Sequence, residues 1–395
     1  MQTEKLYYED AYIREFEAEV ISCSRLTDGK DGTVFAIELD RTAFYPEGGG
    51  QTADTGYMCI DGNDRVRILD TREKEGRILH YADYPIEPGT KVEGLIDWDR
   101  RFDHMQQHSG EHIVSGMICK RFNCDNIGFH MGSDTVIIDY NADVDRETLN
   151  EIEAEANRYI WEAHESRIFF PDREELDKLH YRSKKEIARN VRITEFPGAD
   201  ICACCGTHVK NSAEVGLVKF ISLQHIGKGT RIGLLSGKRA LDFLSMNFEQ
   251  NSEVAKAMAE SLNKTASVYL KQKEELKEAK FRASEAEEKY LKYEAEKYRD
   301  KGNVLVFEDG LTADGVRKYC VILGETAGGR CAVFSRDKDA GFKYAVIYPG
   351  HDIREFIKTM NSALSGRGGG KDGFAQGSVQ AEEGQIREFF SSVLA

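Results

Sequence analysis

The residues best suited to chemistry are two clusters of histidine and cysteine that lie far apart in the sequence. His108 and His112 stand four positions apart in a stretch that favours a helix, so both imidazoles project from one helix face. Cys204 and His208 are also four apart, around Gly206, which permits a bend. Two such pairs provide the nitrogen and sulfur donors of a tetrahedral zinc site. The spacing therefore predicts one zinc ion per chain.

Spacing alone leaves the ligand set open. His104 precedes His108 by four positions on the same helix face, so this pair satisfies the geometry equally well. Cys202 and Cys205 flank the second cluster, and either could replace Cys204 if the turn bends differently. Each pair alone is weak evidence for a metal site, and the prediction depends on both pairs meeting in one domain.

The elements that would position these clusters begin with a small β-barrel at residues 1–97. Short β-prone runs alternate with turn residues, and the clearest strands lie at 34–39, 66–69 and 91–97. Three consecutive glycines at 48–50 permit a tight turn and close backbone contact with another molecule. These glycines form either a plain turn or part of a binding surface.

Residues 98–240 are predicted to form an α+β domain that carries both clusters. Helices are expected at 101–121 and 146–164, where apolar residues recur at helical spacing. The strands expected around these helices lie at 135–140, 191–194 and 216–220.

Residues 241–300 are predicted to form a long helical arm, because they contain no proline and mainly polar or helix-favouring residues. An apolar or aromatic residue recurs at every seventh position, namely at Leu262, Tyr269, Leu276, Ala283 and Tyr290. Such a stripe can form a coiled coil with a second chain. The alternative is a solvated helix packed on its own protein.

The last segment, residues 301–395, is predicted to form a separate α/β domain, so the fold class is α+β and multidomain. Its strands are expected at 304–307, 320–323, 332–334 and 344–348, and its helices at 353–364 and 383–394.

Composition and net charge argue against several classes of protein. No run of about 18 apolar residues occurs, and the N-terminus lacks a basic segment followed by an apolar one, so we expect no membrane association and a cytoplasmic location. The nine cysteines are odd in number and partly clustered, which favours reduced thiols and metal binding over a disulfide scaffold. A net charge of −14 indicates that any contact with RNA is local.

The order H-x-x-x-H followed by C-x-x-x-H resembles the editing domain of alanyl-tRNA synthetase and of its freestanding relatives, the AlaX alanyl-tRNA editing proteins. The glycine-rich run 44–51 looks like the motif of the barrel that precedes this domain in the family, and 127–132 looks like a pocket segment. Residues 364–377 look like the glycine-rich turn of the synthetase's C-terminal domain. The resemblance covers nearly the whole chain and is strongest to the long form of AlaX.

The resemblance also implies roles for individual residues. Its metal ligands fall on His108, His112, Cys204 and His208. It selects His112 over His104, because the segment 109–113 matches the family motif, and it leaves Cys202 and Cys205 as spare thiols. Small polar residues near the metal could bind the hydroxyl of serine, so Ser109 and His130 are the candidates for contact with the substrate's hydroxyl group. The candidate tRNA-binding residues are Gly48, Gly49, Gly50, Arg367 and Lys371.

The activity implied by the resemblance is trans-editing. An aminoacyl-tRNA deacylase of this kind hydrolyses mischarged alanine tRNA and releases serine or glycine, because a synthetase pocket for alanine cannot strongly exclude either by size. The bound zinc would activate water or polarise the ester. Four protein ligands fill a tetrahedral sphere, so the ion either becomes five-coordinate, loses a ligand or chiefly orients the substrate.

The partners implied by the resemblance are mischarged alanine tRNA and a second copy of the chain, bound through the arm and the C-terminal domain. Arg182, Lys184 and Lys185 form a further basic cluster. The main alternative is a non-catalytic RNA-binding protein with structural zinc. A DHH phosphoesterase and an ATP-using synthetase are disfavoured, since neither an Asp-His-His signature nor a G-x-x-x-x-G-K-[ST] loop occurs.

Overall fold

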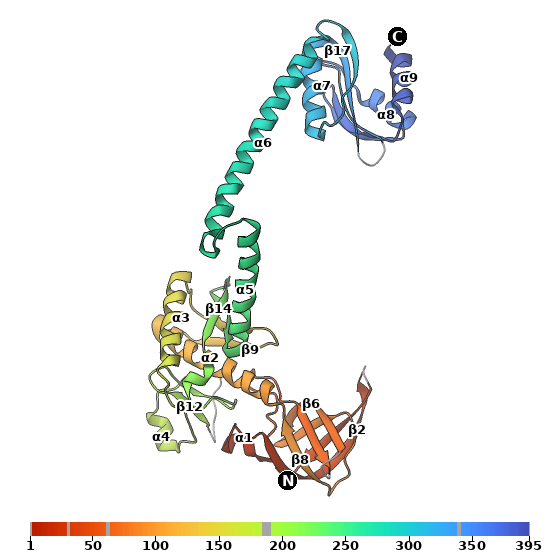
Figure 1. Cartoon of the computed structure of the whole chain (residues 1–395). Helices are drawn as coiled ribbons and strands as arrows, with labels where there is room; N and C mark the ends of the chain where they lie inside the picture. The colour runs from red at the N-terminus through yellow and green to blue at the C-terminus, as the bar shows by residue number, and fades with distance from the viewer. Residues whose placement is uncertain (1, 30–31, 61–63, 184–190, 338–340, 395) are drawn as a thin grey trace. The chain divides into compact units, whose positions relative to one another are not determined.

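A computed structural model of the chain describes residues 2–29, 32–60, 64–183, 191–337 and 341–394 (Figure 1). They form two compact units, Met1–Ser252 and Glu253–Ala395. The finer division into four domains stays a prediction. None of the helices in these described ranges is both long enough and apolar enough to cross a membrane.

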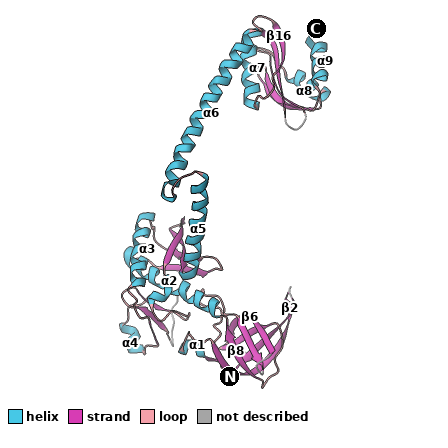
Figure 2. Cartoon of the chain, in the orientation of Figure 1, coloured by secondary structure: helices cyan, strands magenta, loops and turns pink. Residues whose placement is uncertain are grey.

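The first unit begins with a closed β-barrel, which confirms the predicted β module (Figure 2). Around the barrel the strands follow the order β2-β3-β7-β6-β5-β8. Their bounds are β2 (Glu15–Gly29), β3 (Gly32–Leu39), β5 (Gly56–Ile60), β6 (Asp64–Lys74), β7 (Arg77–Ala82) and β8 (Lys91–Ile96). Alternate residues such as Val66 and Ile68 point into the barrel core, because successive side chains of a strand face opposite sides. The short elements β1 (Glu4–Lys5), α1 (Leu6–Glu9) and β4 (Arg41–Thr42) complete this part.

The helix that carries His108 and His112 is α2 (Trp98–Phe122). The side chain of Asp97 caps its start by accepting a hydrogen bond from the Arg100 backbone N–H. Its end is closed by Asn123 in the left-handed conformation. Most positions along its middle are buried, polar ones included, so α2 lies within the domain and not on its surface.

An α+β layer structure surrounds α2, as predicted (Figure 1). A four-stranded sheet has the order β14-β15-β10-β9, and a three-stranded sheet has the order β11-β12-β13. The bounds of these elements are β9 (Asn126–Met131), β10 (Val136–Tyr140), α3 (Arg146–Trp161), β11 (Arg167–Phe169), α4 (Arg173–Lys178), β12 (Ile193–Phe196), β13 (Asp200–Ala203), η1 (Ser212–Val215), β14 (Val218–Ile226) and β15 (Gly229–Ser236). Since β13 ends at Ala203, the second cluster begins the loop that follows it.

The predicted arm is helical but not continuous, which corrects the expectation of one long helix. The chain forms α5 (Gly237–Ala257), a 3-10 turn η2 (Leu262–Lys264) and α6 (Thr265–Glu296). Ala259 adopts a left-handed conformation with φ of 53°, which ends the first helix. Serine and asparagine follow at 261 and 263, and their side chains compete for backbone hydrogen bonds, so they favour a break.

The second unit contains a five-stranded sheet with the order β16-β17-β18-β20-β19. Its elements are β16 (Gly302–Phe307), α7 (Ala313–Ala327), β17 (Gly328–Arg336), β18 (Phe342–Ile347), α8 (Arg354–Ala363), β19 (Gly366–Lys371), β20 (Phe374–Val379) and α9 (Glu383–Leu394). The predicted strand at 320–323 is wrong, because this apolar run lies inside α7. Thr312 caps the start of α7, and Gly328 with φ of 78° ends it, so the run belongs to a capped helix.

Candidate metal centre

Helix α2 and the loop after β13 bring His108, His112, Cys204 and His208 together. One ligand atom from each of the four residues lies within 4.8 Å of the others. The Cys204 sulfur is 3.5 Å from Nε2 of His108 and 3.3 Å from Nε2 of His208. The three imidazoles are almost completely buried. The cluster therefore has the donor types and the spacing of a metal site.

Each imidazole of the cluster also has a partner for its other nitrogen, Nδ1. That of His108 lies 2.9 Å from the side-chain oxygen of Gln51, and that of His112 lies 2.9 Å from a carboxylate oxygen of Asp200. That of His208 lies 3.2 Å from the hydroxyl of Ser109. Each Nε2 remains for a metal ion. Such partners set the tautomer and orientation of metal-binding histidines, so the residues fit zinc.

Charges in the cluster reinforce one another. Burial alone would raise the pKa of the Cys204 thiol, but the neighbouring imidazoles hold it well below its ordinary value, which favours the thiolate. Burial would lower the pKa of His112, whereas the negative charge of Cys204 and the hydrogen bond to Asp200 raise it to about 10. The backbone N–H of Gly206 also donates to the sulfur at 3.3 Å. The pocket thus stabilises the anionic sulfur that a metal needs.

Asp200 is in turn held by Arg182, whose guanidinium donates to its two carboxylate oxygens at 2.7 and 2.8 Å. Burial disfavours the ionised carboxylate, yet these donors and His112 keep the pKa of Asp200 below its ordinary value. Arg182 is therefore engaged in supporting the metal centre, and Lys184 and Lys185 of the predicted basic cluster lie outside the described residues.

The glycine-rich run of the barrel reaches the metal centre through Gly50 and Gln51. Gly50 has φ of 88°, and a Cβ atom there would lie 2.5 Å from the ring of Phe129, so only glycine fits. The ring of Phe129 stacks on His108, with centroids 5.1 Å apart. Gln51 is fully buried and its oxygen also accepts the backbone N–H of Thr207 at 3.1 Å. The barrel thus supports a histidine of the neighbouring domain.

The two candidates for substrate contact are not placed as free groups facing the cluster. The Ser109 hydroxyl contacts His208 and accepts the backbone N–H of Val209 at 3.1 Å, so it supports the site. His130 is exposed on β9, next to Phe129. Neighbouring residues of a strand face opposite sides, and Phe129 faces His108, so His130 lies on the other face of β9 and its contact with the substrate's hydroxyl stays a prediction.

The remaining histidine and thiols of the motif lie outside the four-residue cluster. His104 is buried and its Nε2 lies 3.1 Å from the Thr52 hydroxyl. Cys202 forms a separate group with His112 and Asp200, and Cys205 is exposed. The family pattern selects His108 and His112 over His104 and His108. These two histidines are the ones whose nitrogens lie near Cys204 and His208.

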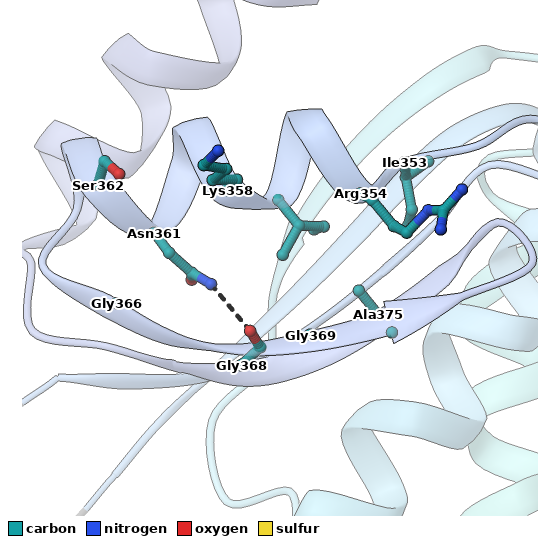
Figure 3. A pocket seen from close by; sticks show the side chains of 11 residues that line it. Ile353, Arg354, Lys358, Asn361, Ser362, Gly366, Gly368, Gly369 and Ala375 are labelled. Atoms are coloured by element: carbon teal, nitrogen blue, oxygen red, sulfur yellow. Dashed lines mark hydrogen bonds between the residues drawn. The ribbon is translucent and has the colours of Figure 1, made fainter.

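The predicted tRNA-binding residues of the C-terminal domain lie on β19, which forms a strand where a turn was expected. Arg367 and Lys371 are exposed there. A groove of about 400 Å³ separates this strand from α8, and its lining includes Arg354, Lys358 and the glycines at 368–370 (Figure 3). Asn361 crosses it to donate to the Gly368 carbonyl at 3.2 Å. Arg367 does not line the groove, and Lys371 lines a neighbouring hollow.

Replacing Gln51 by leucine is expected to weaken metal binding about tenfold to a hundredfold, because partners of metal-binding histidines contribute that much. Gln51→Leu removes the acceptor at His108 Nδ1, and Gln51→Glu keeps an oxygen there and serves as the matched control. Competition with a chromophoric chelator measures the affinity, and the melting temperature reports on folding. Equal affinity in Gln51→Leu and the unmodified chain would show that the contact is incidental.

Three segments match known families. Residues 1–100 match tRNA synthetases class II (A), residues 191–232 match the threonyl and alanyl tRNA synthetase second additional domain, and residues 300–395 match the DHHA1 domain. The second of these contains Cys204 and His208. The matches thus fall on the barrel, on part of the metal-centre domain and on the C-terminal domain.

Whole proteins match as well. The alanyl-tRNA editing protein AlaX-L of Pyrococcus horikoshii is 29% identical over 97% of this chain and 96% of its own length. AlaX-M of Methanosarcina barkeri is 37% identical over 58% of this chain and 96% of its own length. The alanine–tRNA ligase of Ignicoccus hospitalis is 34% identical over 61% of this chain and only 26% of the ligase. This chain belongs to the AlaX family of alanyl-tRNA editing proteins, which are aminoacyl-tRNA deacylases.

Proposed function

We propose that this chain removes wrongly attached amino acids from alanine tRNA by hydrolysing the ester bond between the amino acid and the terminal ribose. The proposal depends above all on one observation, the buried convergence of His108, His112, Cys204 and His208. Family membership supports it, because the relatives are named for alanyl-tRNA editing.

The metal ion at this centre is proposed to be zinc, one per chain, held by His108, His112, Cys204 and His208. Three imidazole nitrogens and one thiolate suit zinc better than magnesium or calcium, which prefer oxygen ligands. Bound zinc supplies Lewis-acid chemistry, which polarises an ester carbonyl or lowers the pKa of water to about 7.

Residues around the metal centre hold its ligands in position before the ester binds. Gln51, Asp200 and Ser109 fix the three imidazoles, so the donor atoms need not reorganise when substrate binds. Phe129 covers one face of His108 and limits access of water from that side. We propose that serine, and also glycine, are released, whereas the correctly attached alanine is spared.

Serine on alanine tRNA is expected to be released faster than glycine or alanine, since a hydroxyl-binding site rejects a ligand that lacks the hydroxyl. Release of each labelled amino acid from alanine tRNA measures this order, before and after treatment with a chelator. The chelator is expected to stop release and added zinc to restore it. Equal release of all three amino acids, unaffected by the chelator, would rule out the proposed function.

The same measurement distinguishes the proposed deacylase from a competing proposal, a non-catalytic RNA-binding protein with structural zinc. Four protein ligands fill a tetrahedral sphere, which is typical of structural sites. Such a protein would bind the tRNA without releasing serine beyond one equivalent.

A second copy of the chain is the proposed partner besides tRNA. Large apolar residues of α6 are exposed, including three members of the predicted heptad stripe: Tyr269, Leu276 and Tyr290. An apolar stripe of this kind is a suitable surface for pairing with the same helix of another copy.

A further inference from the structure

A buried carboxylate lies beside the metal centre without belonging to its four ligands. Glu111 of α2 is 2% exposed and directly precedes the ligand His112 in the chain. Its Oε2 lies 4.0 Å from Nε2 of His112, the nitrogen that remains for a metal ion. Cys204 is partly exposed, which leaves one side of the centre open to solvent. A molecule bound at the metal centre would therefore have a carboxylate close by.

The other carboxylate oxygen of Glu111 is held in place by its neighbours. This oxygen, Oε1, accepts the hydroxyl of Ser115 at 2.7 Å and the side-chain amide of Asn126 at 2.5 Å. The Ser115 hydroxyl in turn lies 2.6 Å from the hydroxyl of Tyr140. All four residues are buried. The network connects α2 to β9 and β10 and fixes the orientation of the carboxylate.

A structural role alone does not explain the negative charge of Glu111. A glutamine would accept the same two hydrogen bonds through its carbonyl oxygen, and burying an amide costs much less free energy than burying a carboxylate. The charge at this position therefore suits a substrate that carries a cation. An aminoacyl ester carries one, because a single carbon atom separates its α-ammonium group from the ester carbonyl.

Asn126 adds a second acceptor beside Glu111. Asn126 begins β9 and is 7% exposed, and its Oδ1 has no hydrogen-bond partner among the described residues. A buried acceptor that stays unpaired costs stability, so this position suits a donor that a ligand brings. An ammonium group has three N–H donors and no acceptor, and it therefore fits a carboxylate together with an amide oxygen.

We propose that Glu111 and Asn126 bind the α-ammonium group of the aminoacyl ester and so restrict this chain to esters with a free amino group. An acylated amine is neutral and has a single N–H donor, and its acyl group needs additional room. The site thus rejects peptidyl and N-acetylaminoacyl esters of the same RNA. The assignment rests on the proposed function, because it needs an aminoacyl ester at the metal centre.

Two substrates that differ only at this amine test the assignment, namely alanine tRNA carrying serine and the same tRNA carrying N-acetylserine. For the unmodified, zinc-loaded full chain, kcat/KM is expected to be at least about tenfold higher with the free amine, because a hydrogen bond to a charged group contributes about that much. Glu111→Gln keeps the acceptor for Ser115 and Asn126, and it should lose most of the preference by acting more slowly on seryl-tRNA alone. Glu155→Gln makes the same change on an exposed side chain of α3 and is the control.

Binding without turnover gives a second measurement. The probes are 3′-deoxy-3′-(L-serylamino)adenosine, in which an amide replaces the labile ester, and its N-acetyl derivative. Isothermal titration is expected to show at least about tenfold tighter binding of the unblocked probe to the unmodified chain, and a smaller difference for Glu111→Gln and for Asn126→Ala. Zinc content and melting temperature show whether each variant is loaded and folded.

Equal kcat/KM values of the unmodified chain for the two substrates would overturn the assignment, and this comparison does not require any variant to fold. An equal loss on both substrates in Glu111→Gln would also overturn it, because the carboxylate would then act on the ester and not on the amine. If the unmodified chain releases serine from neither substrate, the proposed function itself fails, so the two failures can be told apart.

Discussion

Replacing Cys204 by alanine is expected to lower the release of serine from mischarged alanine tRNA by at least about a hundredfold and to remove the metal from the protein. Even outer partners of metal ligands contribute about ten- to a hundredfold, so a direct ligand should contribute more. Without the sulfur, only three imidazoles remain as ligands in a buried site. Metal analysis and deacylation rates of the purified variant measure both effects.

The neighbouring thiol provides a matched control for this change. Cys205 is exposed and does not belong to the four-residue cluster, so Cys205→Ala should keep the metal and the activity. If Cys204→Ala retained one zinc per chain and normal turnover, the ligand assignment would be wrong. If Cys205→Ala lost the metal instead, the loop would bend in the alternative way that the sequence left open.

Replacing Asp54 by alanine is expected to lower the free energy of unfolding of the first unit by about 3–5 kcal/mol, because it leaves a buried charge without its partner. Arg101 and Asp54 are both fully buried and form an ion pair. Arg101 also donates to the carbonyls of Ala11 and Ala43, and Asp54 accepts the backbone N–H of Tyr45 at 2.6 Å. This network joins α2 to the barrel. Denaturant unfolding followed by tryptophan fluorescence measures the loss.

An exposed ion pair shows what a change of charge alone would do. Glu151 of α3 pairs with Arg121 of α2 in the same unit, and both side chains are substantially exposed. Glu151→Ala should leave the unfolding midpoint almost unchanged, since exposed pairs contribute little. An Asp54→Ala variant as stable as the unmodified chain would mean that the buried network does not connect the barrel to α2.

The local parts of the metal centre could be predicted from the sequence. A spacing of four residues brings His108 and His112 onto one face of a helix wherever that helix packs. The spacing of Cys204 and His208 is local too, but the loop between them is held by Arg192, whose side chain donates to the Cys204 and Gly206 carbonyls. The supporting residues Gln51 and Asp200 could not be found this way, because their contacts with the histidines depend on tertiary packing.

The difference between local and tertiary information also explains the two wrong predictions, the strand at 320–323 and the continuous helical arm. The apolar run at 320–323 suits a buried strand or a buried helix, and only its caps at Thr312 and Gly328 decide for the helix. The break at Ala259 requires a backbone conformation that alanine rarely adopts. The face of β9 on which His130 lies depends on how that strand packs against α2, and the sequence does not contain that information directly.

X-ray absorption at the zinc edge of the purified full chain tests most directly whether both clusters hold one ion. The expected result is one zinc per chain with a single sulfur at about 2.3 Å and nitrogen ligands at about 2.0 Å. Protein purified without metal, or a zinc shell that contains no sulfur, would contradict the joint site of His108, His112, Cys204 and His208.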